Sequence, residues 1–283
     1  MSDSNLNNTA KNSHDFHLVD PSPWPIFTSF VIFILAITAV LFFHDYVHHS
    51  KYLLIGASGL VLSALYLWWK DIIKEGLVDK AHTSPVRIGF KIAMWLFIFT
   101  EVMFFVAFFW STMKAWIYPV NALDGVWIKD ILKWPPKGIE TLEPFDLPLI
   151  NTLILLLSGT TVSWAHNAIL NGNNKTAAKA LIITVLLGLI FTALQGFEYY
   201  HATFSLGGDD QSAIYPSNFY LATGFHGAHV IIGTIFLLVC AVRASKNHFT
   251  KEDHVAFECA AWYWHFVDVV WLLLFILVYF LAG

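Results

Sequence analysis

The fold is decided by residues 92–113, which read IAMWLFIFTEVMFFVAFFWSTM. Apart from Glu101, these 22 residues carry no charged side chain. Because a helix rises about 1.5 Å per residue, the stretch is roughly 33 Å long and can cross the hydrocarbon core of a bilayer. It therefore predicts a transmembrane helix with one acid near its middle.

Six further stretches of similar length carry no Asp, Glu, Lys or Arg, or only one. They are residues 24–43, 52–69, 147–165, 180–197, 217–242 and 259–281. The stretch 217–242 is placed after Pro216, because proline disrupts a helix interior. The ten-residue alternation of β-barrel strands is absent. We expect an all-α, polytopic membrane protein with seven transmembrane helices.

The composition supports this class. Hydrophobic residues make up 57% of the chain and charged residues 13%, whereas a soluble domain has about 25% charged residues. The net charge of −4 argues against a nucleic-acid-binding protein. The chain has only two cysteines, Cys240 and Cys259. This excludes a disulfide scaffold and a cysteine-based zinc or iron–sulfur site.

Lysine and arginine are distributed unequally between the two sides of the membrane. With the N-terminus in the cytoplasm, the cytoplasmic segments hold eleven of these residues and the outer segments five. The positive-inside rule therefore predicts a cytoplasmic N-terminus and an external C-terminus.

Four segments follow from this arrangement. They are a polar cytoplasmic segment (1–23), the first two helices (24–69), a charged cytoplasmic connector (70–91), and the last five helices (92–283) with an outer loop at 114–146. The connector is the best internal boundary, and it divides the helices into groups of two and five.

Glu101 is the sharpest single signal in the sequence. It is the tenth residue of its 22-residue stretch, which places it near the bilayer midplane. Carboxylates at this depth are costly and are usually retained for function. We interpret Glu101 as a buried acid with a role in proton movement or lipid contact. A purely structural hydrogen bond to a neighbouring helix remains an open alternative.

Four other polar side chains lie within the predicted spans: His226, His229, His265 and Asp268. The His226–His229 spacing offers two metal ligands without an obvious third, and axial haem histidines normally come from different helices. We expect these side chains, and His166, to form structural interhelical hydrogen bonds. The expectation for the chain is therefore no catalytic residue and no metal site.

Trp69 and Arg243 lie at the cytoplasmic ends of their predicted spans. An indole beside a cation at headgroup depth suits a phospholipid phosphate, which arginine can bind bidentately. Ordinary interfacial anchoring explains the same pattern equally well. No phosphate-binding loop, Ser–His–Asp array or dinucleotide fingerprint occurs.

Several local strings carry a resemblance to a known family. They are 17–25 (HLVDPSPWP), 68–75 (WWKDIIKE), 99–105 (FTEVMFF), 151–152 (NT), 164–166 (WAH), 223–230 (TGFHGAHV) and 260–271 (AAWYWHFVDVVW). Together they resemble subunit III of the haem–copper cytochrome c oxidases. The resemblance runs from about residue 17 to the last residue, and the last two strings are its most specific part.

The resemblance implies a subunit of an oxidoreductase that couples oxygen reduction to proton pumping in aerobic respiration. It implies that haem and copper belong to the partner subunits I and II, and that this chain stabilises subunit I and supports proton uptake. It further implies phospholipids in a cleft between the two helical groups. By position, Glu101 is the buried acid with Phe97 one turn earlier, and Trp69 and Arg243 contact lipid.

Two departures from the family pattern are the pair His166-Asn167 and the segment 207–217. The polar N-terminal extension favours a bacterial inner membrane over a mitochondrial one. A quinol oxidase subunit III is an alternative, although such subunits commonly lack the first two helices. An independent transporter or a di-histidine haem protein are further alternatives, and the expected inverted repeats of a transporter are not evident.

Overall fold

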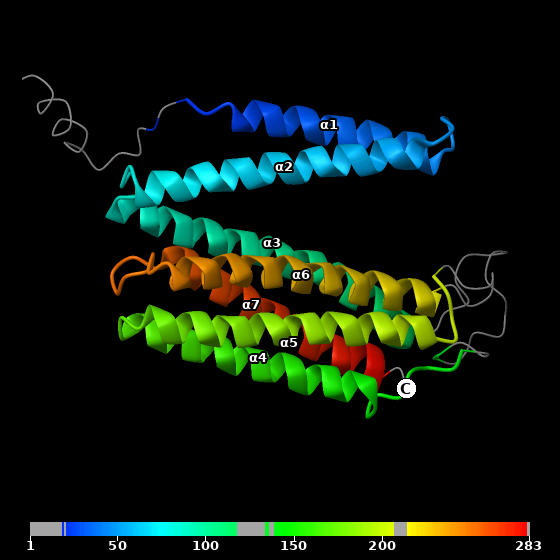
Figure 1. Ribbon diagram of the computed structural model, residues 1–283. Coiled ribbons are helices and arrows are strands. Elements are labelled where there is room, and N and C mark those ends of the chain that lie inside the picture. The colour runs from blue at the N-terminus through cyan, green and yellow to red at the C-terminus, as the bar shows by residue number, and fades with distance from the viewer. Residues whose placement is uncertain (1–18, 20, 118–133, 136–138, 207–213, 282–283) are drawn as a thin grey trace, which may run out of the picture. The chain divides into compact units, whose positions relative to one another are not determined.

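The computed structural model describes residues 19, 21–117, 134–135, 139–206 and 214–281. Within them the chain forms seven α-helices and a short π-helix, η2 (Figure 1). They are α1 (Trp24–Phe43), α2 (Ser50–Leu77), α3 (Ser84–Ile117), α4 (Leu147–Leu170), α5 (Asn174–His201), α6 (Ile214–Ser245), α7 (Val255–Leu274) and η2 (Phe275–Phe280).

In the part of the chain that the structure describes, seven helical segments, with α7 continuous with η2, are long and apolar enough to cross a membrane. The predicted all-α architecture with seven spans is therefore confirmed. The segment 1–23, the outer loop 114–146 and the segment 207–217 fall largely outside the described residues.

The helices are longer than the charge-free stretches that predicted them. The stretch ending at Trp69 belongs to α2, which continues to Leu77, and α3 begins at Ser84 rather than Ile92. Lysine and glutamate are good helix formers, so a helix can continue past the bilayer core into water. Charge-free runs therefore measure the apolar length of a span and underestimate the length of its helix.

Helix α6 begins at Ile214, three residues before the predicted position. Pro216 lies in its first turn, where backbone N–H groups have no acceptor within the helix and proline costs little. Pro25 and Pro148 are the second residues of α1 and α4, and they are tolerated for the same reason. Proline marks the start of these helices from inside the first turn.

The chain divides into two compact units, residues 1–90 and 91–283. In the first unit, α1 and α2 form an antiparallel hairpin. Ala57 and Ala64, two turns apart on α2, are buried, which lets the two backbones approach closely. Trp24 Nε1 at the start of α1 donates to Asp71 Oδ2 near the end of α2, over 2.5 Å. This hydrogen bond joins the two helices at the end of the hairpin opposite its turn.

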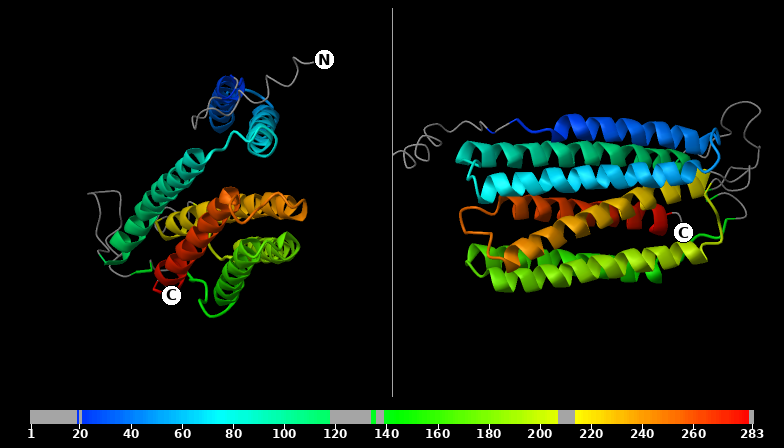
Figure 2. Two further views of the ribbon diagram at one scale, coloured as in Figure 1. Left: turned by 90° about the vertical axis from the view of Figure 1, so that its left-hand side faces the viewer. Right: turned by 45° about the horizontal axis from the view of Figure 1, so that its top comes forward.

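In the second unit, α4, α5, α6 and α7 pack in a ring in which each helix contacts two of the others. Helix α5 packs against α4 and α6, and α7 packs against α6 and α4 (Figures 1 and 2). Helix α7 is the most buried of the spans. Helix α3 contacts α6 and α7 through side chains, including the stacked pair Phe97 and Tyr263, with ring centroids 6.3 Å apart.

The interior of the second unit is organised around Trp264 of α7, which is fully buried. A Cβ atom on Gly188 or Gly233 would lie within 2.9 Å of its ring, so both glycines make room for the indole. Trp264 Nε1 donates to Ser158 Oγ over 2.8 Å, and Trp271 Nε1 donates to Thr152 Oγ1 over 2.9 Å. These bonds connect α7 to α4 without leaving a buried donor unpaired.

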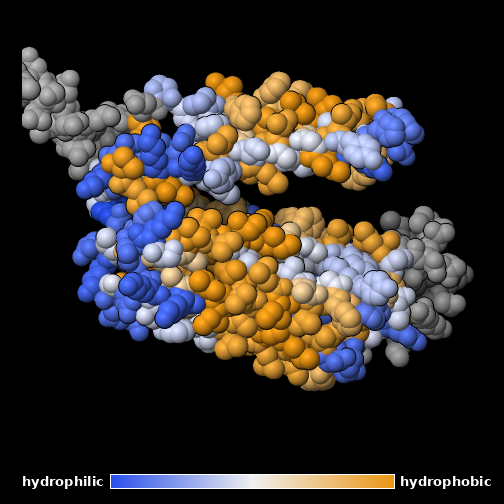
Figure 3. All heavy atoms as spheres, in the orientation of Figure 1, coloured by the Kyte–Doolittle hydropathy of each residue, from blue (hydrophilic) through white to orange (hydrophobic). Residues whose placement is uncertain are grey.

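The surface of the second unit fits a lipid environment. Hydrophobic residues cover the middle of α4, α5 and α6, and hydrophilic residues gather around the α4–α5 and α6–α7 connections (Figure 3). Exposed apolar side chains on a soluble protein would be a liability, but lipid tails solvate them.

Candidate functional site

Glu101, the predicted buried acid, pairs with a histidine on a neighbouring helix. Its Oε2 lies 2.8 Å from His229 Nε2 on α6, and the exposed fractions of the two side chains are 22% and 12%. The rings of Phe105 and Tyr263 flank the imidazole, with centroids 5.1 and 6.3 Å away. The acid therefore faces another helix inside a largely apolar layer.

The hydrogen bonds of His229 define where protons can sit. Its Nδ1 lies 2.6 Å from the carbonyl oxygen of Phe225, which only accepts, so Nδ1 carries a proton. The Nε2–Oε2 hydrogen bond with Glu101 then holds one further proton, on either the ring or the carboxyl group. The ion pair and the neutral pair differ only in the position of this proton.

His226 makes a separate contact. Its Nε2 donates to the carbonyl oxygen of Val267 on α7 over 3.1 Å, and the residue is 1% exposed. The ring packs between Phe191 and Trp271, with centroids 5.7 and 5.2 Å away. His226 therefore joins α6 to α7.

His265 and Asp268 lie together on the side of α7 that faces α4. His265 Nδ1 is 3.7 Å from Asp268 Oδ2. A Cβ atom on Gly159 of α4 would lie 2.6 Å from the same oxygen, so glycine provides the space for this carboxyl group. The four predicted polar residues thus fall into three separate groups, of which two make hydrogen bonds between helices.

The three predicted lipid-contacting residues occupy partly open positions. Trp69 of α2 is 58% exposed and Phe97 of α3 is 46% exposed. Arg243 lies in the last turn of α6, and its guanidinium carbon is 4.8 Å from the centre of the Phe249 ring. Among the described residues, Arg243 Nε has no hydrogen-bond partner.

Comparison with known proteins shows the family. The profile described as "Cytochrome c oxidase subunit III" matches residues 14–283. The chain belongs to this family. The chain is 56% identical to the probable cytochrome c oxidase subunit 3 of Rickettsia conorii over 278 residues, covering 97% of this chain and 96% of that protein.

Two other relatives agree with this assignment. Cytochrome c oxidase subunit 3 of Arabidopsis thaliana is 48% identical over 270 residues, covering 95% of this chain and 97% of the relative. The probable subunit 3 of Rickettsia bellii is 55% identical over 277 residues, covering 97% of this chain and 98% of the relative. The resemblance expected from the local strings is confirmed. The chain is a multi-pass membrane subunit of an oxidoreductase complex, and this subunit is non-catalytic.

One buried acid was missed from the sequence. Glu198, in the last turn of α5, is 2% exposed. Its Oε1 accepts hydrogen bonds from Tyr279 Oη at 2.7 Å and Gln195 Nε2 at 3.3 Å. In the sequence, Glu198 follows directly on the charge-free stretch 180–197 and therefore looks like its boundary. The spacing of Glu198 from Phe191 and Gln195 places the three residues on one face of the helix, and this spacing could have predicted that Glu198 is buried.

The position of Tyr279 depends on the π-helix η2. A π-helix inserts one extra residue per turn and rotates the following side chains relative to an α-helix. In η2 this places Tyr279 inside the unit, 2% exposed, with its hydroxyl on Glu198. Nothing in the apolar string Phe275–Phe280 signals the change in helix type.

Proposed function

We propose that this chain acts as the non-redox subunit III of a proton-pumping cytochrome c oxidase in a bacterial inner membrane. In this role it stabilises subunit I, while subunits I and II hold the haem and copper. The family assignment and the seven spans support this proposal. The charge distribution supports a cytoplasmic N-terminus and a periplasmic C-terminus.

The assembly is tested by purifying the tagged full chain in mild detergent from cells grown with oxygen. We expect mass spectrometry to find a haem–copper subunit and a dicopper subunit in the same complex. A chain that purifies without them and conducts protons after reconstitution would instead support an independent transporter. A Soret absorbance band from the chain alone would support a haem protein.

We further propose that the Glu101–His229 pair supports proton supply to the oxidase. The single observation behind this proposal is the hydrogen bond between Glu101 and His229, which holds one movable proton at mid-membrane depth. The proton can move between the carboxyl group and the ring within this hydrogen bond, so the pair can hold a proton where water is scarce.

The Glu101→Gln variant tests this role. The amide can still donate to His229 Nε2, so we expect the free energy of assembly of the oxidase to change by less than about 1 kcal/mol. Because the amide has no carboxyl proton to exchange with His229, proton uptake during turnover in proteoliposomes should slow. The Thr100→Val variant on the adjacent residue is the control. Unchanged proton uptake in Glu101→Gln would show that the pair is only structural.

Lipid binding is proposed for Trp69, Phe97 and Arg243. Arg243 places one face of its guanidinium group on Phe249, and its Nε is buried. A headgroup phosphate would accept from the terminal guanidinium nitrogens. The lipid-filled cleft between the two helical groups stays a prediction.

We expect Arg243→Ala to reduce the phospholipid that copurifies with the oxidase and to shorten the lifetime of the enzyme during turnover. Lys246→Ala is the matched control, because Lys246 is exposed three residues further along. Arg243→Lys should retain part of the lipid, since an ammonium group still attracts phosphate as a point charge. Equal lipid content in the alanine variant and the wild type would contradict lipid binding at Arg243.

A further inference from the structure

Three side chains with metal-binding atoms converge near the start of α7. They are His166 of α4, His254 just before α7, and Glu258 in the first turn of α7. One ligand atom from each lies within 4.8 Å of the other two. His254 Nε2 is 3.7 Å from Glu258 Oε1, and the rings of His166 and His254 meet nearly edge to face, with centroids 5.8 Å apart.

The backbone fixes the orientation and tautomer of His254. Its Nδ1 lies 3.0 Å from the carbonyl oxygen of Thr250, so Nδ1 carries the proton. In the neutral ring, Nε2 then carries the free lone pair and lies 3.7 Å from Glu258 Oε1, too far for a direct hydrogen bond. A cation can bind between these two acceptor atoms. Metal-binding histidines are commonly held by this type of Nδ1–H bond to a carbonyl oxygen.

A cation already compensates the negative charge of Glu258. Lys91 of α3 places its Nζ 2.5 Å from Glu258 Oε2. The Lys91 side chain is 38% exposed, whereas that of His254 is 9% exposed. Lys91 can therefore leave toward solvent, whereas the histidine stays in place. A divalent ion would compete with Lys91 for the same carboxylate.

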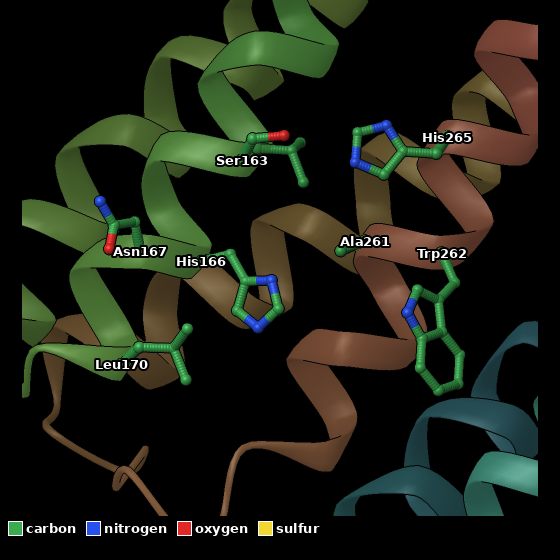
Figure 4. A pocket seen from close by; sticks show the side chains of 8 residues that line it. Ser163, His166, Asn167, Leu170, Ala261, Trp262 and His265 are labelled. Carbon is green, nitrogen blue, oxygen red and sulfur yellow. The ribbon is translucent and has the colours of Figure 1, made fainter.

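The cluster also has space beside it. His166 lines a cavity of about 310 Å³ between α4 and α7, together with Ser163, Ala261 and His265. Figure 4 shows the His166 imidazole pointing from α4 toward α7, next to Ala261 and Trp262. The cavity gives an ion a route to His166 and leaves room for a water ligand.

We propose that His166, His254 and Glu258 form a binding site for Zn²⁺ or a similar divalent transition metal ion. Two imidazoles and one carboxylate, with water in the fourth position, are a common zinc ligand set. Tetrahedral ligands at about 2.0–2.1 Å lie roughly 3.4 Å apart, so no pair of ligand atoms needs to close by more than roughly 1.4 Å around the ion. Binding displaces Lys91 from Glu258 and joins α4 directly to the start of α7.

This site differs from the absence of metal expected from the sequence. That expectation rested on the helical pair His226 and His229, which lacked a third ligand. The new group joins His166 with two residues far along the chain, so spacing within one helix gives no signal. The inference is independent of the proposed role of the chain in an oxidase.

The test uses the isolated full chain in mild detergent, without a polyhistidine tag, which keeps haem and copper subunits out of the measurement. Zn²⁺ is titrated against a chromogenic chelator, and Co²⁺ serves as a spectroscopic probe of coordination. We expect a single ion per chain and a Co²⁺ spectrum with the visible bands of a four-coordinate site. Circular dichroism and size-exclusion profiles verify that each variant is folded.

The test is specific because some variants should weaken Zn²⁺ binding and another should tighten it. Glu258→Gln and His166→Gln should weaken Zn²⁺ binding roughly tenfold or more, at least as much as loss of a residue that orients a ligand. Lys91→Gln should tighten binding, because the competing cation is gone. His265→Gln is the matched control, since His265 lines the same cavity but lies outside the cluster.

Three results would overturn the site. They are no Zn²⁺ binding by the wild type, wild-type affinity in Glu258→Gln, or an equal loss in His265→Gln. Weaker binding in Lys91→Gln would contradict the competition between lysine and metal. Because Lys91 is partly exposed, its replacement leaves the interior packing intact. The Lys91→Gln variant therefore still tests the site if a variant of one of the metal ligands misfolds.

Discussion

Trp264→Ala is expected to lower the free energy of unfolding of residues 91–283 by about 3–5 kcal/mol, the range for removing a buried aromatic ring. The indole is fully buried and lies against Gly188 and Gly233, where no side chain can fill the space that it leaves. The hydrogen bond to Ser158 is lost as well.

Unfolding by SDS in mixed micelles provides the measurement for Trp264→Ala. Trp110→Ala is the control, because Trp110 is also in a span but is 69% exposed. We expect the control to change the unfolding free energy by less than about 1 kcal/mol. Equal effects of the two variants would show that Trp264 is not a centre of packing.

Tyr279→Phe is expected to destabilise the second unit by about 1–3 kcal/mol, because the buried Glu198 loses its shortest hydrogen bond. Replacing both partners, as in Tyr279→Phe with Glu198→Leu, should recover part of this loss, because no carboxyl group is then left without its partner. The recovery is incomplete because the buried Gln195 Nε2 loses both of its acceptors. The difference between the double variant and the sum of the single variants gives the coupling energy.

Tyr200→Phe controls for the loss of a hydroxyl group alone. Tyr200 is in the last turn of α5 but is 84% exposed. The unfolding free energy of the Tyr200→Phe variant should match that of the wild type. If the Tyr279→Phe and Glu198→Leu effects simply add, the two side chains do not depend on each other, and the role assigned to η2 is wrong.

The spans were predictable because lipid imposes a simple condition on the sequence. A run such as 92–113 must be apolar to cross the bilayer, and charges interrupt it at the ends. The same reasoning failed for Glu198, because a charged residue near the end of a run looks like its boundary. It failed again at Lys70–Leu77, where charged side chains continue a helix into water.

The candidate sites were only partly predictable. Depth in the membrane brings Glu101 and His229 to similar levels, and the structure places them 2.8 Å apart. Which residues pair, however, depends on how each helix is rotated, and the sequence does not fix rotation when apolar residues surround a helix on all sides. For this reason Glu101 and His229 were each predicted as polar residues within a span, without their pairing.

The two indole hydrogen bonds of α7 have a consequence for biosynthesis. Trp264 and Trp271 are two turns apart and reach Ser158 and Thr152 of α4, so sliding α7 by one turn would break both bonds. Yet α7 follows α4, α5 and α6 in the chain. The interior of residues 91–283 is therefore completed only after α7 leaves the translocon. Until then, Gly188 and Gly233 border an unfilled space, and the hydroxyl groups of Ser158 and Thr152 lack their indole partners.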